Sequence, residues 1–393
     1  MIRKLLPILG VTFIDIVGFS MLIPVMPYFV THFGASPFAV GVLFSTFSFC
    51  QLLAGPIWGN VSDRIGRKKV LMISQIGATI GWGMLAFAPT LPWVFIARIV
   101  EGISGGNISI TQAYVADVVE PKDRAKAFGL IGAMFGAGMF FGPAIGGILY
   151  PKFGYAAPFL VAAFLQFCTL VITQVMLPES HDGPKEGEER VGLSEIFKSF
   201  GKPHLSRLLW QTPALSLALY GWFAVIALYL QRQLHFTLPD TDYYFSMFAA
   251  FNVIINVAVV GRVSAWVGDR VMSSLGLVCL VVAFASVPIV NGVWMLAVLM
   301  ALFALGMALA NNGLTALISN AAAAREQGTV LGVSSSLDSL SGIIAPPIST
   351  GLLGGMGPAY AGAESGVFAV VAFIMGLVSG RREERAEVQA AES

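Results

Sequence analysis

Long apolar segments are the feature that most constrains what this chain can fold into. A helix needs about 20 apolar residues to cross the hydrocarbon core of a bilayer, and only helices or closed barrels satisfy every backbone polar group there. These segments lack the roughly ten-residue alternation of barrel strands. They predict an all-α integral membrane protein with twelve transmembrane helices, near residues 5–30, 38–61, 69–90, 92–117, 125–151, 154–178, 205–232, 241–264, 271–290, 292–319, 327–354 and 359–380.

Composition and charge agree with a membrane protein and indicate its orientation. Hydrophobic residues make up 56% of the chain and charged residues 11%, whereas a soluble domain carries about 25% charged residues. With the N-terminus inside, twenty of the 23 Lys and Arg residues fall in cytoplasmic segments, Lys152 and Arg232 fall outside, and Arg98 falls within a span. Short cytoplasmic loops collect positive charge, so we expect both termini to be cytoplasmic.

The chain divides into two related halves. The polar stretch after the sixth apolar segment predicts six-helix bundles at 1–178 and 205–381, a cytoplasmic linker at 179–204 and a cytoplasmic tail at 382–393. Residues 126–143 align with 329–346, and residues 101–107 align with 305–311 at a shift of 204. Chance similarity between Gly- and Ala-rich helices is the alternative to a duplication. Duplicated bundles are typical of transporters that alternate access to a site between the halves.

The loop after the second helix combines two glycines, an acid and several basic residues. It reads Gly-Asn-Val-Ser-Asp-Arg-Ile-Gly-Arg-Lys-Lys over residues 59–69. Gly59 and Gly66 permit a tight turn and close backbone approach, and Asp63 can pair with nearby basic side chains or a helix N-terminus. A simple basic anchor at the membrane surface would not need the acid and both glycines. The second-half equivalent, residues 261–270, is degenerate and has Ala265 in place of Asp63.

Three more motifs follow in the first half. They are Asp-Ile-Val-Gly-Phe-Ser-Met-Leu-Ile-Pro-Val-Met-Pro at 15–27, Arg-Ile-Val-Glu-Gly-Ile-Ser-Gly-Gly at 98–106 and Gly-Met-Phe-Phe-Gly-Pro-Ala-Ile-Gly-Gly at 138–147. Together with the loop, they resemble the drug and tetracycline exporter branch of the major facilitator superfamily. The resemblance implies a gate in which Asp63 faces the start of the eleventh helix and Arg67 lies near Asp117. The residues of this predicted gate are Gly59, Asp63, Arg64, Gly66, Arg67 and Asp117.

The third of these motifs is similar to the antiporter motif of that branch. Its small residues lie mostly on one helical face and allow another helix to approach closely, and its proline favours a kink. Close packing alone explains the same residues. The predicted antiporter-motif residues are Gly138, Gly142, Pro143, Gly146 and Gly147.

Ionisable residues within the predicted spans are candidates for function, because charge is costly in a bilayer. Asp15 and Asp338 fall near the middle of the first and eleventh helices, and Arg98 and Glu101 are spaced to share a face of the fourth. Asp338 is the only acid expected deep within the second bundle. These four are the predicted proton-coupling and substrate residues, with static hydrogen-bonded ties as the alternative. A carboxyl in an apolar cavity holds its proton more firmly, so proton and cationic substrate would compete for it.

Amide and aromatic side chains in the spans are candidates for lining a substrate cavity. Amides also tie membrane helices together and aromatic rings also pack, and for any single residue structure is the expected role. The set comprises Gln51, Asn107, Tyr220, Trp222, Phe223, Asn252, Asn256, Asn311 and Asn312.

These features predict a proton-coupled antiporter, acting as a monomer in a bacterial inner membrane, that exports small amphiphilic or cationic compounds. No cofactor, metal site or nucleic-acid partner is expected; the partners are the substrate, protons and lipids. The third and ninth helices lack the acids, and the eighth the histidine, that tetracycline exporters characteristically use, which argues against tetracycline itself. A metabolite facilitator or symporter and a lipid carrier are the alternatives. An integral-membrane enzyme is a distant one, because no zinc-ligand, nucleotide-loop or nucleophile-elbow pattern occurs.

Overall fold

The computed structural model describes residues 2–105, 107–119, 124–180, 203–321 and 327–392, and within these ranges it holds helices and short connections without a strand. The predicted linker at 179–204 lies mostly outside the described residues. The chain divides into two compact units, one made of Met1–Glu188 with Leu230–Ala250 and the other of Glu189–Tyr229 with Phe251–Ser393. The predicted domain boundaries near 178 and 205 stay a prediction.

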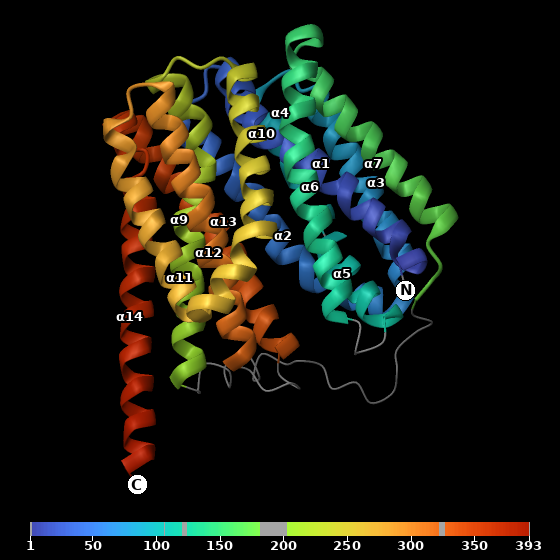
Figure 1. Ribbon diagram of the computed structural model, residues 1–393. Coiled ribbons are helices and arrows are strands. Elements are labelled where there is room, and N and C mark those ends of the chain that lie inside the picture. The colour runs from blue at the N-terminus through green and yellow to red at the C-terminus, as the bar shows by residue number, and fades with distance from the viewer. Residues whose placement is uncertain (1, 106, 120–123, 181–202, 322–326, 393) are drawn as a thin grey trace. The chain divides into compact units, whose positions relative to one another are not determined.

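The helices of the first half correspond to the first six predicted spans. Within the first unit, α1, α3, α6 and α7 run side by side (Figure 1), and α1 packs against both α6 and α7. The helices are α1 (Ile2–His32), α2 (Pro37–Ile65), α3 (Arg67–Ala86), α4 (Leu91–Ser104), α5 (Asn107–Val118), α6 (Arg124–Phe153) and α7 (Ala156–Met176).

The fourth predicted span is broken into α4 and α5. At the break, three carbonyl groups at the end of α4 accept hydrogen bonds from side chains of α2 and α3. The Gln51 amide donates to Gly105 O at 3.1 Å, Trp58 Nε1 donates to Ile103 O at 2.6 Å, and the Ser74 hydroxyl donates to Ser104 O. A helix end inside a membrane needs such donors. The break is therefore compatible with the bilayer.

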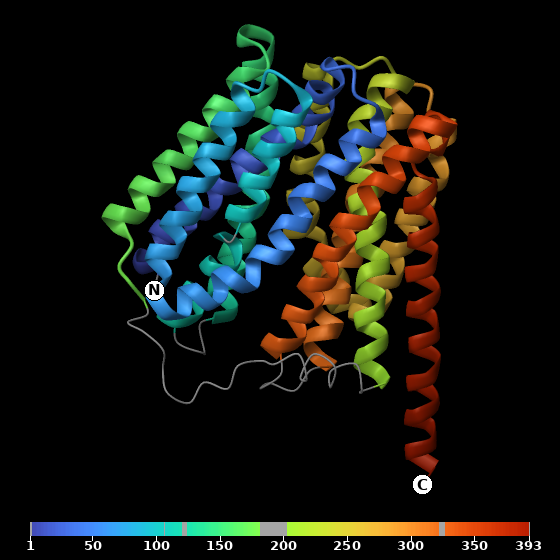
Figure 2. The ribbon, with the colours of Figure 1, turned by 180° about the vertical axis from the view of Figure 1, so that it is seen from behind.

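The helices of the second half correspond to the last six predicted spans (Figure 2, from behind). The eighth span ends and the ninth begins inside α11, at Gly268, which has φ 80° and ψ 161°. The elements are α9 (Pro203–Gln233), α10 (Leu238–Ile255), the π-helix η2 (Asn256–Val260), α11 (Gly261–Ser286), the 3₁₀ turn η3 (Val287–Ile289), α12 (Val293–Ala321), α13 (Gln327–Met356), the 3₁₀ turn η4 (Pro358–Tyr360) and α14 (Ala363–Glu392).

Length and hydropathy support the membrane assignment. Within the described residues, nine stretches are long and apolar enough to cross a bilayer, and one of them, Leu238–Ile289, contains 52 residues. At about 1.5 Å per residue, that stretch is long enough for two crossings, which meet at Gly268. The broken pair α4 and α5 and helix α13 occupy the other two predicted spans. The helices are thus consistent with twelve crossings. The predicted tail from residue 382 continues helix α14.

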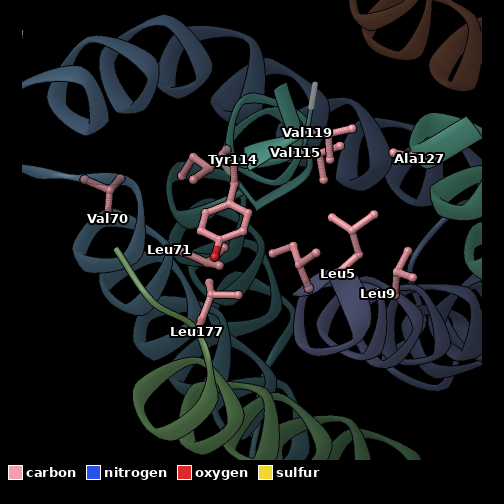
Figure 3. Close-up of a cluster of buried hydrophobic side chains, with 11 residues drawn as sticks. Leu5, Leu9, Val70, Leu71, Tyr114, Val115, Val119, Ala127 and Leu177 are labelled. Carbon is pink, nitrogen blue, oxygen red and sulfur yellow. The ribbon is translucent and has the colours of Figure 1, made fainter. Parts of the chain in front are cut away.

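A cluster of buried apolar side chains closes one end of the first unit. Figure 3 shows Tyr114 of α5 pointing toward Leu71 of α3 and Leu177 just beyond α7, with Leu5 of α1 on the other side. The Tyr114 hydroxyl donates to Pro178 O at 3.2 Å. The cluster joins α1, α3, α5, α6 and α7 beside the loop that carries the predicted gate.

Candidate functional site

The first unit holds a buried ion pair on α4. Arg98 is 1% exposed and Glu101 5% exposed. The Arg98 guanidinium donates from Nη1 to Glu101 Oε2, and it lies 4.2 Å from the centre of the Phe47 ring on α2. Nη2 of Arg98 is buried and has no hydrogen-bond partner among the described residues. The pair therefore has an unused donor.

Glycines bring the neighbouring helices close to this pair. A Cβ atom at Gly81 of α3 would lie 3.1 Å from Glu101 Cβ, and one at Gly102 would lie 2.8 Å from Phe47 O on α2. Larger residues at either position would push the helices apart. The charged turn of α4 is held between α2 and α3 because these two positions lack side chains.

Asp15 lies near the middle of α1 and is half-buried, as its position in the sequence predicted. One face of the same helix packs against the glycines of α6. The Ser20 hydroxyl donates to Gly138 O at 2.9 Å, and a Cβ atom at Gly142 would lie 2.6 Å from Val17 O. Pro143 is buried within α6. The predicted close approach along the antiporter motif is thus present, with α1 as the partner helix.

Gly146 and Gly147 continue the same face of α6 and meet a residue that the sequence analysis did not select. A Cβ atom at Gly147 would lie 2.8 Å from Asp242 Cβ on α10. Asp242 is 1% exposed. It falls at the predicted start of the eighth span, where an acid is ordinarily solvated, and no local pattern marks it as buried.

Two acids of the second unit are paired with hydroxyl groups. Asp338 on α13 accepts from Ser216 on α9, and Glu364 on α14 accepts from Ser349 on α13. Glu364 is 6% exposed, and a side chain at Gly221 of α9 would collide with its carboxylate. Glu364 is therefore a further buried acid of the second half that was not predicted. Glu364 was missed because it is close to the start of the last apolar segment.

Three of the predicted amides form a ladder in the second unit. Asn312 Nδ2 of α12 donates to Asn256 Oδ1 at 2.9 Å, and Asn256 Nδ2 donates to Asn252 Oδ1 at 2.9 Å. Asn256 begins the π-helix η2, and π-helical turns inside α-helices are frequent at functional sites. Asn256 and Asn312 are exposed, so the ladder presents polar groups at the protein surface. Asn311 is also exposed and lies next to the ladder in the sequence.

The other cavity candidates take different places. Trp222 is 1% exposed and packs against Phe284 and Phe303, with ring centres 5.6 and 6.1 Å away, so it is a core residue rather than a cavity residue. Phe223 is half-buried, Tyr220 is 42% exposed, and Gln51 is used at the end of α4. The side chain of Asn107 lies outside the described residues.

The predicted gate residues form a compact ionic cluster in the first unit. Arg67 Nη1 lies 2.6 Å from Asp63 Oδ1, and Arg67 Nε lies 3.1 Å from Asp117 Oδ2. Arg67 thus lies beside Asp117, as the resemblance implied. Gly66 turns the chain between α2 and α3 with φ 104°. Gly59 O accepts from the Ser62 hydroxyl, and Arg64 is exposed.

Glu179 completes this cluster and was not predicted. Its Oε1 accepts from the backbone N–H of Lys68 at 3.2 Å, in the first turn of α3. A Cβ atom at Gly66 would collide with its carboxylate. A carboxylate at a helix N-terminus is stabilised by the helix dipole and the free N–H groups. Glu179 lies just past α7 and therefore ties the end of that helix to the start of α3.

Comparison with known proteins agrees with this architecture. The chain is 28% identical over 365 residues to the tetracycline resistance protein, class C, of Escherichia coli, with 89% of each chain covered. It is 27% identical to multidrug resistance protein 2 of Bacillus subtilis, with 86% of this chain and 85% of that protein covered.

Solved structures share the fold. A bacterial homolog of the human lysosomal transporter Spinster, in an inward-facing and unoccupied conformation, superposes with a TM-score of 0.80 at 17% identity and covers 96% of both chains. The nucleoside transporter NupG superposes with a TM-score of 0.79 at 11% identity.

The family match covers most of the chain. Residues 8–346 match the Major Facilitator Superfamily, and a second match covers residues 214–393. This family consists of transporters, so the prediction of an integral membrane transporter for small molecules, rather than an enzyme, is confirmed. Because the match covers more than half of the chain, the chain belongs to the Major Facilitator Superfamily.

Proposed function

We propose that this protein is a proton-coupled antiporter that exports small amphiphilic or cationic compounds. The buried Arg98–Glu101 pair is the observation that carries the proposal. An ion pair removed from water is costly unless both charges are compensated, and here one guanidinium nitrogen has no hydrogen-bond partner among the described residues. The stability of such a pair therefore changes when Glu101 gains or loses its charge.

Proton binding and substrate binding exclude one another at this pair. When Glu101 is protonated, Arg98 loses its counter-charge and the interaction across α4 weakens. When Glu101 is ionised, it attracts a cationic substrate or holds Arg98. Asp15 on α1 is the second carboxyl in this scheme. Alternating access then exchanges one species for the other, as expected for two related bundles.

The substrate class follows from the exposed groups and from the relatives. The amide ladder of Asn252, Asn256 and Asn312 offers hydrogen bonds, and Tyr220 offers an aromatic face. The named relatives include tetracycline and multidrug resistance proteins. Helix α3 contains no acid, and the acid of α11, Asp269, lies directly after Gly268 at a helix junction, where it accepts from Ser264. We therefore propose drug-like amphiphiles rather than tetracycline.

The proposed cellular setting is a bacterial inner membrane, with both termini in the cytoplasm and the protein acting as a monomer among its lipids. The distribution of Lys and Arg supports this orientation. Export by proton exchange fits it, because a proton gradient directed inward then drives outward movement of the substrate.

Reconstituted vesicles containing a pH-sensitive dye test the proposal. A proton gradient is imposed, and lipophilic cations and neutral drugs are screened for substrate-dependent proton flux. Glu101→Gln and Asp15→Asn should each reduce this flux more than about tenfold, because an amide side chain cannot bind and release the proton that exchanges with the substrate. Asp240→Asn, an exposed acid on α10, is the matched control and should keep it. Substrate movement that ignores the gradient and survives both substitutions would indicate a facilitator or lipid carrier.

A further inference from the structure

Asp242 is a buried acid that the exchange scheme above does not use. It lies in the second turn of α10, and 1% of it is exposed. Neither of its carboxyl oxygens has a hydrogen-bond partner among the described residues. A buried carboxyl group without donors or a counter-charge requires a physical explanation.

The surroundings of Asp242 are the glycine face of α6 and apolar side chains of α1. Besides the approach at Gly147, Asp242 Oδ1 lies 3.7 Å from the Cβ position of Gly146. That same position is 3.2 Å from Met21 Cγ of α1. The carboxyl therefore fills a space that exists because two successive residues of α6 lack side chains.

The titratable groups that face Asp242 within the described residues carry no positive charge. Tyr28 of α1 is hydrogen-bonded to the adjacent Thr241, with 2.7 Å between the two hydroxyl oxygens. Tyr150 of α6 and Asp240 of α10 also lie near Tyr28. Asp240 is exposed and accepts from the backbone N–H of Thr237 at 2.9 Å. None of these groups offers a counter-ion for an ionised Asp242.

Packing of α10 on α6 is therefore coupled to the charge of Asp242. An ionised carboxylate in this position would be desolvated without compensation, which is unfavourable. A neutral carboxyl avoids that penalty. By linkage, a contact that requires the protonated form loses stability as pH rises, because the separated form binds fewer protons.

We propose that Asp242 is a further proton-binding site, separate from Glu101 and Asp15, which controls the contact of α10 with the Gly146–Gly147 face of α6. With its proton bound, the start of α10 packs on this face. Loss of the proton to water at the nearby surface drives α10 away from α6. In the proposed orientation this is the external side, so the inference rests on the proposed function and deepens it: external protons stabilise the packing of α10 on α6 within the first unit.

A thiol placed on α10 reports this contact without any substrate. Ala249, 5% exposed, follows Asp242 by seven residues and therefore lies on the same helix face. Ala249→Cys is introduced into a protein whose Cys50, Cys168 and Cys279 are replaced by Ser. The rate of alkylation by a membrane-impermeant maleimide is then measured in vesicles as the pH changes. The reaction itself depends on pH, and this dependence is measured with an exposed reference thiol, Tyr243→Cys, and subtracted.

The alkylation rate should rise about tenfold per pH unit over the range in which the carboxyl loses its proton. Asp242→Asn should remove this pH dependence and leave alkylation slow, because the amide is always neutral. Asp240→Asn should retain the pH dependence. Gly147→Ala should make alkylation fast at every pH, since its methyl group displaces Asp242.

Two outcomes separate the inference from the proposed function. A pH dependence that persists in Asp242→Asn, or a Gly147→Ala protein that stays slow, overturns the role of Asp242. Absence of substrate-driven proton flux in the parent protein overturns the antiport proposal, while the thiol measurement still reports on Asp242. A single symmetric peak in size-exclusion chromatography establishes that each variant is folded.

Discussion

Helices α4 and α12 occupy equivalent positions in the two halves of the sequence, yet their side chains differ in kind where α4 carries its ion pair. The shift of 204 residues that aligns the halves places Leu302 and Leu305 of α12 opposite Arg98 and Glu101 of α4. The first half holds an ion pair where the second holds two leucines. In the second half, the half-buried Asp338 on α13 and the buried Glu364 on α14 are paired with hydroxyl groups.

Backbone geometry at the two junction glycines, in contrast, is similar. Gly66 has φ 104° and ψ 148°, and Gly268 has φ 80° and ψ 161°. Both positions turn the chain between two helices of a repeat. The two halves thus share glycine at the junction between two helices, whereas the polar groups within the bundles differ.

The largest expected effect comes from breaking the ion pair on one side. Glu101→Ala leaves the Arg98 guanidinium buried without its counter-charge and should cost about 3–5 kcal/mol of stability. Replacing both residues by leucine, as α12 has them, should cost less, because no buried charge remains. Thermal unfolding in detergent, followed by Trp fluorescence, measures both variants. A double variant that is less stable than Glu101→Ala would contradict this account.

Substitution at the two junction glycines should have the next largest effect. An alanine in either backbone conformation is strained by about 1–3 kcal/mol. Gly66→Ala must also displace the Glu179 carboxylate, whereas nothing lies within 4 Å of the Cβ position of Gly268. Gly66→Ala should therefore lower the unfolding temperature more than Gly268→Ala. Equal losses would show that Glu179 moves aside at no cost.

The acid–hydroxyl pairs of the second half should be weaker than the ion pair. Ser349→Ala removes the hydroxyl that donates to Glu364 and should cost about 1 kcal/mol. Ser349→Cys, with a weaker donor of similar size, should lie between Ala and the parent. Unfolding temperatures of the three proteins provide the measurement, and a ranking with Cys below Ala would argue that packing rather than hydrogen bonding matters at this position.

The smallest expected change is in the ionic loop. Asp117→Asn removes one of the two carboxylates that Arg67 contacts, near the protein surface, and should cost less than about 1 kcal/mol. This loss should shrink as salt is raised, because exposed charges are screened. The loss of unfolding temperature caused by Glu101→Ala should change little with salt, because the Arg98–Glu101 pair is buried. A salt response of the same size in both variants would contradict the difference in burial.

Much of the fold and part of the candidate site were predictable from local patterns. Apolar segments of about 20 residues require helices in a bilayer wherever they occur in a chain. The spacing of Arg98 and Glu101 on one helix face required only the helical period. The placement of Arg67 beside Asp117 came from the family resemblance and not from spacing, since 50 residues separate them.

The residues that the sequence analysis missed or misplaced depend on long-range packing. Asp242 is buried because Gly146 and Gly147, far away in the chain, leave room for it. Glu364 is buried because Gly221 on α9 leaves room for its carboxylate. Trp222 is a core residue because three rings from α9, α11 and α12 surround it. No window of neighbouring residues contains these partners.

The sequence by itself determined the membrane-spanning helices, the two related halves, the family and the ion pair within α4. These follow from hydropathy, repetition and helical spacing, all of which can be recognised within short stretches of the sequence. The tertiary structure decided which acids are buried, which amides join in a ladder and which glycines receive a neighbouring side chain. The physical reason is that burial and pairing are properties of surfaces brought together from distant parts of the chain, and the cost of a buried charge depends on what those surfaces supply.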